Sequence, residues 1–199
     1  KPSGTRVEDI ISELDGKVEY ILDGGFTDIG LESTVIKVEN NKIHILRPGK
    51  ITREQLEEVI EEVEIDRHVL EKVEQNEVVS SPGMKYRHYA PNTKCMMIYS
   101  KVEEEMIDKI NEVTNQMKQE NKKVLVIGKQ EHLDSYIADE KWNMGKTLEE
   151  VAKNIFTLLR KVDKEQVDLV ILEGVGEKGL GLAITNRLIR ACAYNYIVV

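Results

Sequence analysis

The chain has 199 residues, of which 41% are hydrophobic and 32% are charged, a balance typical of a globular protein with one large domain or two small ones. No apolar run approaches the length of a membrane span, and two cysteines far apart in the sequence argue against a disulfide framework or a structural zinc site. We therefore expect a cytoplasmic protein that does not enter a membrane.

The net charge of −8 comes from one segment rather than from the whole chain. Residues 54–77 hold ten acidic side chains against Arg67 and Lys72, so this segment alone carries a charge of −8. Because the remainder is neutral, bulk charge neither favours nor excludes nucleic acid as a partner. Three segments contain no Asp or Glu: residues 40–53, 78–102 and 178–199.

The first third of the chain predicts two helices around a short strand and a hairpin. Thr5 is suited to cap a helix that runs through Leu14. Residues 18–22 have the pattern of a short strand that enters a tight turn. Residues 52–63 predict a second helix, because a Thr-x-x-Gln capping box precedes apolar positions at helical spacing.

The hairpin is predicted by two alternating segments, Thr34–Glu39 and Lys42–Arg47, joined by Asn40-Asn41. Asparagines tolerate the positive φ angles of a type I′ turn, so a two-residue loop is expected. With that loop Glu39 pairs with Lys42, which brings Thr34 opposite Arg47.

This register makes the Glu32-Ser33-Thr34 and Arg47-Pro48-Gly49 segments neighbours at one end of a sheet. Hydroxyls and a guanidinium that converge there could hold a phosphate or a carboxylate. The spacing fits equally well an Arg47 that is a surface cation neutralised by Glu32. Strict alternation also points Ser33 away from Arg47, so both serve one ligand only if the strand end twists.

The acid-free segment 78–102 combines cations, tyrosines and prolines. Its centre contains Lys85, Tyr86, Arg87, His88 and Tyr89 in succession. Such a composition suits a strap laid across an anion. Composition alone favours the other interpretation, an interdomain linker that happens to be basic.

The second half of the chain alternates buried strands with amphipathic helices, with strands expected at residues 95–99, 124–128, 167–172 and 196–199. This alternation predicts a small parallel sheet with helices on both faces. The glycine-rich loop 174–181 lies where such folds bind phosphates, but it matches neither GxGxxG nor a Walker motif. A flexible connection is therefore the favoured interpretation of the loop.

Several polar residues of this half have no clear chemistry in the sequence. Asn186, Arg187 and Arg190 lie on the helix after the glycine loop, where they could pack against the loop or dock another domain. His132 is isolated in the sequence, and no nucleophile–base pair is recognisable. We therefore predict no catalytic residue and no metal ligand, and chemistry that works by positioning and charge stabilisation.

Four motifs that appear in order resemble the threonylcarbamoyl-AMP synthase (YrdC/YwlC) family in its two-domain form. The motifs are Leu22-Asp23-Gly24-Gly25, Gly30-Leu31-Glu32-Ser33-Thr34-Val35, Leu46-Arg47-Pro48-Gly49 and Ser81-Pro82-Gly83-Met84-Lys85-Tyr86-Arg87-His88-Tyr89-Ala90-Pro91. The segment 179–188 is similar to the end of the family's accessory domain, so the resemblance covers essentially the whole chain.

The resemblance implies an α/β fold in which residues 1–77 are the C-terminal part of a YrdC-like catalytic domain. Residues 78–93 would be the interdomain linker or strap, and residues 94–199 a small Rossmann-like accessory domain with a parallel sheet. Family members begin with about half a catalytic domain that this chain lacks. We therefore expect an incomplete fragment of the enzyme that is inactive by itself.

The reaction implied by the resemblance joins L-threonine, bicarbonate and ATP into threonylcarbamoyl-AMP and releases pyrophosphate, with Mg²⁺ as the usual partner of ATP. A separate tRNA threonylcarbamoyl-transferase complex then uses the product, which makes tRNA an indirect partner only. Motif matching assigns ATP binding to Ser3, Arg47, Tyr86 and His88, and threonine binding to Ser33.

A second hypothesis is a non-catalytic binding module. Residues 94–199 would then be a regulatory or assembly unit, and the acid-free segments would dock RNA or a partner protein. This hypothesis ranks second because those segments lack a platform of stacked aromatic side chains for RNA bases.

Overall fold

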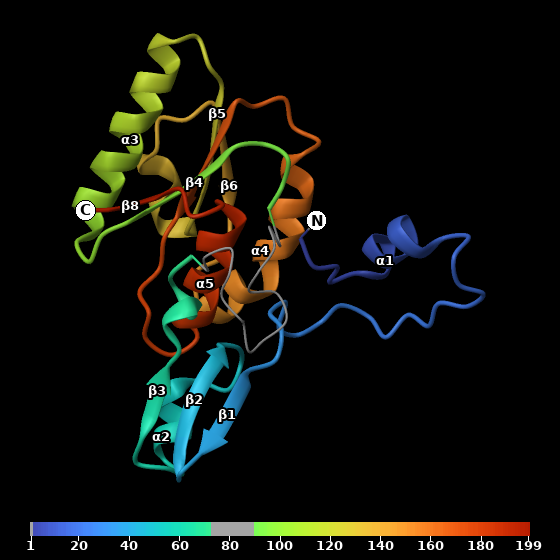
Figure 1. The fold of residues 1–199 in the computed structure, drawn as a ribbon. Coiled ribbons are helices and arrows are strands. Elements are labelled where there is room, and N and C mark those ends of the chain that lie inside the picture. The colour runs from blue at the N-terminus through green and yellow to red at the C-terminus, as the bar shows by residue number, and fades with distance from the viewer. Residues whose placement is uncertain (1, 73–89) are drawn as a thin grey trace.

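The computed structural model describes residues 2–72 and 90–199, which form an α/β protein with two separate sheets (Figure 1). The smaller sheet has the order β1-β2-β3, with β1 and β2 antiparallel and β3 parallel to β2. Its three strands are β1 (Val35–Glu39), β2 (Lys42–Arg47) and β3 (Val63–Ile65). The short helix α2 (Arg53–Glu57) and the 3₁₀ helix η1 (Arg67–Val69) accompany this sheet.

The larger sheet contains five parallel strands in the order β6-β5-β7-β4-β8. The strands are β4 (Cys95–Tyr99), β5 (Val124–Gly128), β6 (Glu140–Asn143), β7 (Leu169–Glu173) and β8 (Tyr196–Val198). The helices are α3 (Glu103–Gln119), α4 (Leu148–Val162) and α5 (Gly181–Ala191), with the 3₁₀ helix η2 (Gln130–Ser135) after β5.

Helices cover both faces of this sheet, as its buried strands require. One core cluster packs α4 and α5 against one face, and a second packs α3 against the other. Figure 1 shows α3 on the opposite side of the strands from α4 and α5. The predicted Rossmann-like parallel sheet is therefore confirmed.

The hairpin forms through the expected turn but in a different register at its open end. Asn40 and Asn41 have φ angles of 51° and 60°, and Glu39 pairs with Lys42 as predicted. A bulge between Val35 and Ile36 then shifts the register, so that Val35 lies opposite Arg47. The predicted pairing of Thr34 with Arg47 is wrong, because an alternating pattern does not reveal an extra residue in one strand.

Three other local predictions fail. Residues 18–22 form no strand, and the helix α1 (Val7–Leu14) begins after Arg6 without a side-chain cap from Thr5. The second predicted helix does form its capping box but ends at Glu57. Val63 lies in β3 instead, because it completes the small core with residues of β2.

The segment that precedes β1 in the sequence packs directly against the part of the chain that contains the larger sheet. Leu31 belongs to the core cluster formed by α4 and α5, although it comes from the first part of the sequence. A Cβ atom on Gly30 would lie 2.7 Å from the backbone oxygen of Ala152 in α4, so only glycine permits this approach. The domain boundaries at 77/78 and 93/94 remain a prediction.

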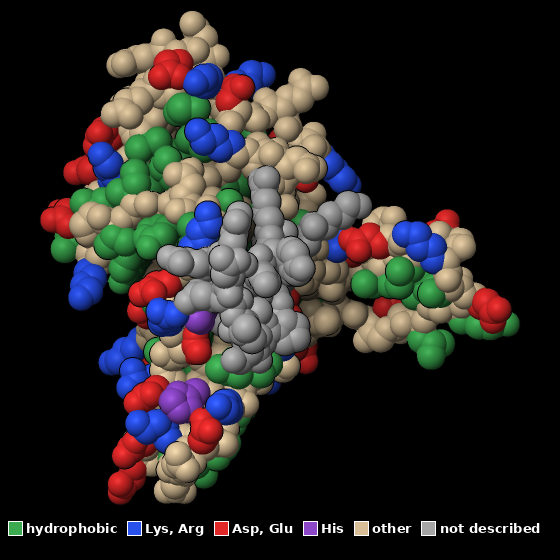
Figure 2. Space-filling model, viewed as in Figure 1, with side chains coloured by type: hydrophobic (Ala, Val, Ile, Leu, Met, Phe, Trp, Pro, Cys, Tyr) green, Lys and Arg blue, Asp and Glu red, His purple; other side chains and the backbone are tan. Residues whose placement is uncertain are grey.

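The helix α1 stands apart from the rest of the described structure (Figure 1). None of its residues is buried, and hydrophobic side chains are visible on its surface in Figure 2. Arg160 of α4 anchors it through Glu13, at 2.6 Å. No helix among the described residues is long and apolar enough to cross a membrane.

Candidate functional site

The open end of the hairpin brings Arg47 and Ser33 together. Arg47 donates from Nε to the backbone oxygen of Ser33 at 3.0 Å and from Nη2 to its hydroxyl at 3.2 Å. The bulge next to Val35 breaks the strict alternation, so the two side chains meet despite their positions in the sequence. Ser33 and Arg47 therefore lie within hydrogen-bond distance of each other.

The turn after β2 packs tightly against the segment before β1. We call these two segments, residues 32–34 and 47–49, the hairpin corner. A Cβ atom on Gly49 would lie 2.4 Å from both the backbone oxygen of Glu32 and the backbone nitrogen of Thr34. Thr34 also donates its hydroxyl to the backbone oxygen of Ile51 at 2.7 Å. The two motif segments that the sequence placed at one end of a sheet therefore lie in direct contact.

Glu32 joins Ser3 to the accessory part of the chain. One carboxylate oxygen accepts a hydrogen bond from the hydroxyl of Ser3 at 2.6 Å. The other accepts from Nε of Arg187 in α5 at 2.7 Å. The interpretation of Arg47 as a cation neutralised by Glu32 is therefore wrong, because Glu32 is paired with Arg187.

The charge of Glu32 is stabilised by these partners. Burial by itself would raise the pKa of its carboxyl group, but the Arg187 guanidinium and the Ser3 hydroxyl outweigh burial and lower the pKa below its ordinary value. Glu32 is consequently an anion at neutral pH. It offsets the charge of a guanidinium whose side chain is only 1% exposed.

The helix α5 makes further contacts with the first part of the chain. Arg190 donates to the backbone oxygen of His68 at 2.9 Å, and Asn186 donates to the backbone oxygen of Val69. Gly179, in the glycine-rich loop before the helix, donates its N–H to Glu54 at 3.0 Å. Of the two predicted roles for the polar face of this helix, docking against another part of the protein is the one observed.

Two of the predicted site residues, Tyr86 and His88, lie outside the described residues. Ser3, Ser33 and Arg47 are described, and they are linked through the Glu32-Ser33 segment. Ser3 and Ser33 do not touch the same partner atom. Ser3 contacts the carboxylate of Glu32, and Ser33 contacts the guanidinium of Arg47.

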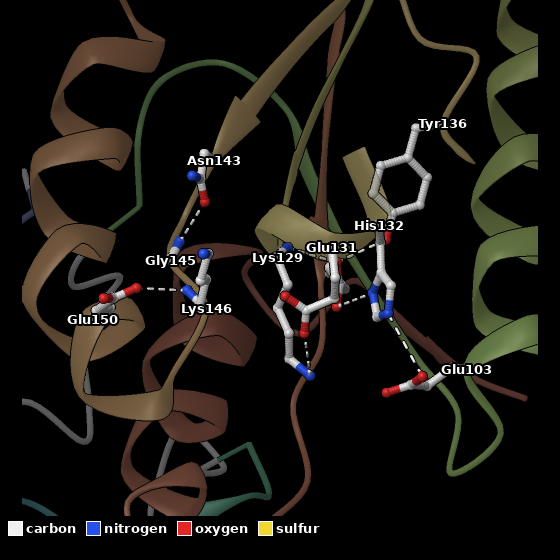
Figure 3. Close-up of polar contacts among 10 residues, drawn as sticks. Glu103, Lys129, Glu131, His132, Tyr136, Asn143, Gly145, Lys146 and Glu150 are labelled. Carbon is white, nitrogen blue, oxygen red and sulfur yellow. Dashed lines mark hydrogen bonds and ion pairs between the residues drawn. The ribbon is translucent and has the colours of Figure 1, made fainter. Parts of the chain in front are cut away.

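A second polar cluster lies at the carboxyl end of β7, and sequence reasoning missed it. Glu173 is 0% exposed and accepts hydrogen bonds from the Tyr136 hydroxyl at 2.7 Å and the Lys129 backbone N–H at 2.7 Å. His132 lies 2.9 Å from Glu173 through Nδ1 and 3.7 Å from Glu103 through Nε2 (Figure 3). His132, which is isolated in the sequence, therefore belongs to a polar cluster in the structure.

This cluster has a structural role that its geometry explains. Burial and the neighbouring Glu173 raise the pKa of Tyr136 far above its ordinary range, so the phenol remains a hydrogen-bond donor. The three donors attach η2 and the start of its loop to the strand β7. Glu173 ends an otherwise apolar strand, which was the only sequence signal for the cluster.

The other sulfur and acidic groups offer no alternative centre among residues 2–72 and 90–199. Within these residues, no three His, Cys, Asp or Glu side chains are grouped to hold a metal ion. Both cysteines are buried, and burial raises the pKa of Cys192 well above its ordinary value. The hairpin corner is therefore the better candidate for a site.

Comparison with known protein families identifies the family of this chain. A family profile described as "Threonylcarbamoyl-AMP synthase, C-terminal domain" matches residues 51–193, and a profile described as "Telomere recombination" matches residues 1–49. The chain belongs to the threonylcarbamoyl-AMP synthase family. The resemblance carried by its motifs is thus confirmed.

Individual relatives of the family are considerably longer than this chain. A threonylcarbamoyl-AMP synthase of Pyrococcus abyssi is 43% identical over 199 residues, which are 100% of this chain and 56% of that protein. The Bacillus subtilis protein of the same name is 38% identical over 193 residues, 96% of this chain and 54% of its own length. The chain therefore spans about half the length of these synthases.

A solved structure supports the same membership at the level of the fold. The crystal structure of Pyrococcus abyssi Sua5 complexed with L-threonine aligns with a TM-score of 0.88 and 43% identity. The alignment covers 100% of this chain and 56% of that one. The two-part α/β arrangement is therefore that of the family.

Proposed function

We propose that this chain is the C-terminal portion of an L-threonylcarbamoyladenylate synthase. The complete protein would convert L-threonine, bicarbonate and ATP into threonylcarbamoyl-AMP, with pyrophosphate and water as the other products. The observation that carries the proposal is the contact between Arg47 and Ser33, a guanidinium and a hydroxyl held 3.2 Å apart at a sheet corner. In the proposal these two groups bind two different substrates of one reaction.

Arg47 is the residue assigned to the phosphates of ATP. Its two bonds to Ser33 fix the plane of the guanidinium, and a fixed guanidinium can pair with two oxygens of a phosphate. Ser33 would meet the threonine substrate through its hydroxyl. The adjacent arrangement supports a role in which the amino acid and the phosphates of ATP are held next to each other.

The remaining assignments rest on the motifs. Ser3 would contact ATP, and Tyr86 with His88 would close the strap over the nucleotide. Because the chain spans about half the length of its relatives, the other half of the substrate pocket would come from residues that precede this chain in the complete protein. We accordingly propose that the chain alone is inactive.

Mg²⁺ enters the proposal only with ATP. No group of three acidic, His or Cys side chains among the described residues is arranged around a cation. Mg²⁺ commonly binds to the phosphate oxygens of ATP, and the proposal places the ion there. No role of a residue in this chain depends on it.

The product would be passed on rather than used by this protein. Threonylcarbamoyl-AMP is a mixed anhydride, so its acyl group is activated for transfer. A separate tRNA threonylcarbamoyl-transferase complex in the cytoplasm would consume it, and tRNA would be an indirect partner.

The test is release of pyrophosphate from L-threonine, bicarbonate and ATP, compared between this chain and the complete protein. We expect release by the complete protein that requires all three substrates, and none by the chain alone. Failure of the complete protein would overturn the proposal. Steep salt-dependent binding of tRNA to the chain, in place of activity, would favour the non-catalytic binding module.

A further inference from the structure

The segment that presents Ser33 is held from behind by the accessory part of the chain. Gly30 lies against the backbone of α4, and Leu31 is buried in the core cluster that includes residues of α4 and α5. Glu32 then pairs with Arg187 of α5 at 2.7 Å. Three successive residues before Ser33 therefore contact the accessory domain, and Ser33 itself contacts Arg47.

Arg187 contacts both segments of the hairpin corner at once. Its Nε donates to the carboxylate of Glu32, next to Ser33, and its Nη2 donates to the backbone oxygen of Pro48 at 3.1 Å, next to Arg47. Its Nη1 contacts the side-chain oxygen of Asn186 on the same helix. A planar guanidinium can satisfy three acceptors in fixed directions, which a lysine ammonium cannot reproduce.

We propose that Arg187 is a positioning residue for the substrate site, through which the accessory domain sets the separation of Ser33 and Arg47. This inference rests on the proposed function and adds a residue to it. Arg187 lies on a different domain from the residues it orients, 155 positions from Glu32 in the sequence. It acts through its neighbours and is not expected to touch a substrate.

The physical reason is that Arg187 holds Glu32 through an ion pair in which the guanidinium is buried and the Glu32 side chain is 22% exposed. Glu32 and Pro48 lie at the ends of loops, where backbone positions are otherwise free to shift by fractions of an ångström. A guanidinium that is 1% exposed and bonded to both cannot move without leaving a buried charge unpaired. Displacement of binding groups by such shifts weakens substrate binding even when no contact atom is removed.

The helix α5 offers a matched control one turn away. Arg190 is also buried, and its hydrogen bond among the described residues goes to the backbone oxygen of His68 rather than to Glu32, Ser33 or Arg47. Replacement of either arginine removes a guanidinium from the interface between the two domains. Only Arg187→Met removes the link to the hairpin corner.

The experiment measures steady-state kinetics and amide hydrogen exchange of the complete protein. For Arg187→Met we expect KM values for L-threonine and ATP raised about tenfold with kcat changed by less than about threefold. Arg187→Lys should restore part of the loss, and Arg190→Met should leave both KM values near those of the wild type. Exchange of the amides in residues 32–34 and 46–49 should be faster in Arg187→Met than in Arg190→Met.

Equal KM values in Arg187→Met and the wild type would overturn the inference, as would an equal rise in Arg190→Met. If Arg187→Met does not fold, Glu32→Gln keeps the shape of the pair and should raise the same KM values, and its failure to do so counts equally against the inference. Absence of synthase activity in the wild type would instead overturn the proposed function. The exchange comparison would then still decide whether Arg187 orders the corner.

Discussion

The guanidinium of Arg47 is bonded twice to Ser33, to its backbone oxygen at 3.0 Å and to its hydroxyl at 3.2 Å. These bonds use Nε and Nη2, and Nη1 has no hydrogen-bond partner among residues 2–72 and 90–199. The free edge of the guanidinium is therefore available to a further anion at this corner. This relationship leads to the first prediction.

Arg47→Ala should weaken binding of ATP to the complete protein by about 1.5–3 kcal/mol, the usual range for a lost charged hydrogen bond. This corresponds to a Kd raised by about ten- to 150-fold. Isothermal titration with ATP measures the effect. Arg53→Ala is the control, because Arg53 pairs with Glu57 on the exposed helix α2, at 2.7 Å, which is its only ion pair within residues 2–72 and 90–199. An unchanged Kd in Arg47→Ala would refute the assignment of this residue.

The neighbourhood of Ser33 and Arg47 was predictable from the sequence because a hairpin with a two-residue loop has few registers. Asn40-Asn41 marked the turn, and the alternation of the two segments fixed the pairing from Glu39 back to Ile36. The bulge was not predictable, because no residue near Val35 is distinctive for it. The bulge shifts the register by one residue, and this shift allows Ser33 and Arg47 to meet.

The parallel sheet was also predictable, since its central strands β5 and β7 are apolar except for Glu173 at the end of β7, and its helices are amphipathic. The strand β6 was missed because its sequence, Glu-Lys-Trp-Asn, is polar and largely exposed at the sheet edge. The Glu32–Arg187 pair and the Glu173 cluster could not be derived either. Both join residues far apart in sequence, and no local pattern reports such a contact.

The pair between Glu32 and Arg187 also makes stability depend on pH. The folded-state pKa of Glu32 is lowered, so its contribution is fully present above its unfolded value of about 4.3 and is lost as the pH falls through the folded pKa. We expect Glu32→Gln to be less stable than the wild type at pH 7. The difference should shrink at acidic pH, as the wild-type carboxylate takes up its proton.

Urea unfolding of the wild type and of Glu32→Gln between pH 3 and pH 7 measures this dependence. Other acidic groups with lowered pKa values, such as Glu54 and Asp139, are present in both proteins and cancel in the comparison. A difference in stability that stays constant over this range would contradict the role assigned to the ion pair.

The buried Glu173 leads to a prediction about the stability of the part of the chain that contains the larger sheet. Tyr136→Phe removes one of the three donors to a carboxylate that is 0% exposed, and should lower the free energy of unfolding by about 1–3 kcal/mol. Tyr196→Phe is the control, because Tyr196 lies at the exposed edge strand β8 and should change stability little. Thermal or urea unfolding followed by circular dichroism measures both. Equal stability of the two variants would show that Glu173 does not need the phenol.

The exposed apolar surface of α1 leads to the last prediction. Leu14 and Ile11 are 38% and 45% exposed, and no residue of this helix is buried. The Pyrococcus abyssi relative is covered over only 56% of its length by this chain, and residues 51–193 match the C-terminal domain of the family. We therefore expect the preceding part of the catalytic domain in the complete protein to pack on this face of α1.

Ile11→Asp distinguishes this packing from simple exposure. In the 199-residue chain the substitution should change the free energy of unfolding by less than about 0.5 kcal/mol, as is usual for surface positions. In the complete protein it should cost about 2 kcal/mol or more, because a charge would be buried in an apolar contact. Val59→Asp, at a position 79% exposed beside α2, should have little effect in either protein. A loss of stability in Ile11→Asp that is the same in both proteins would mean that α1 remains uncovered in the complete protein.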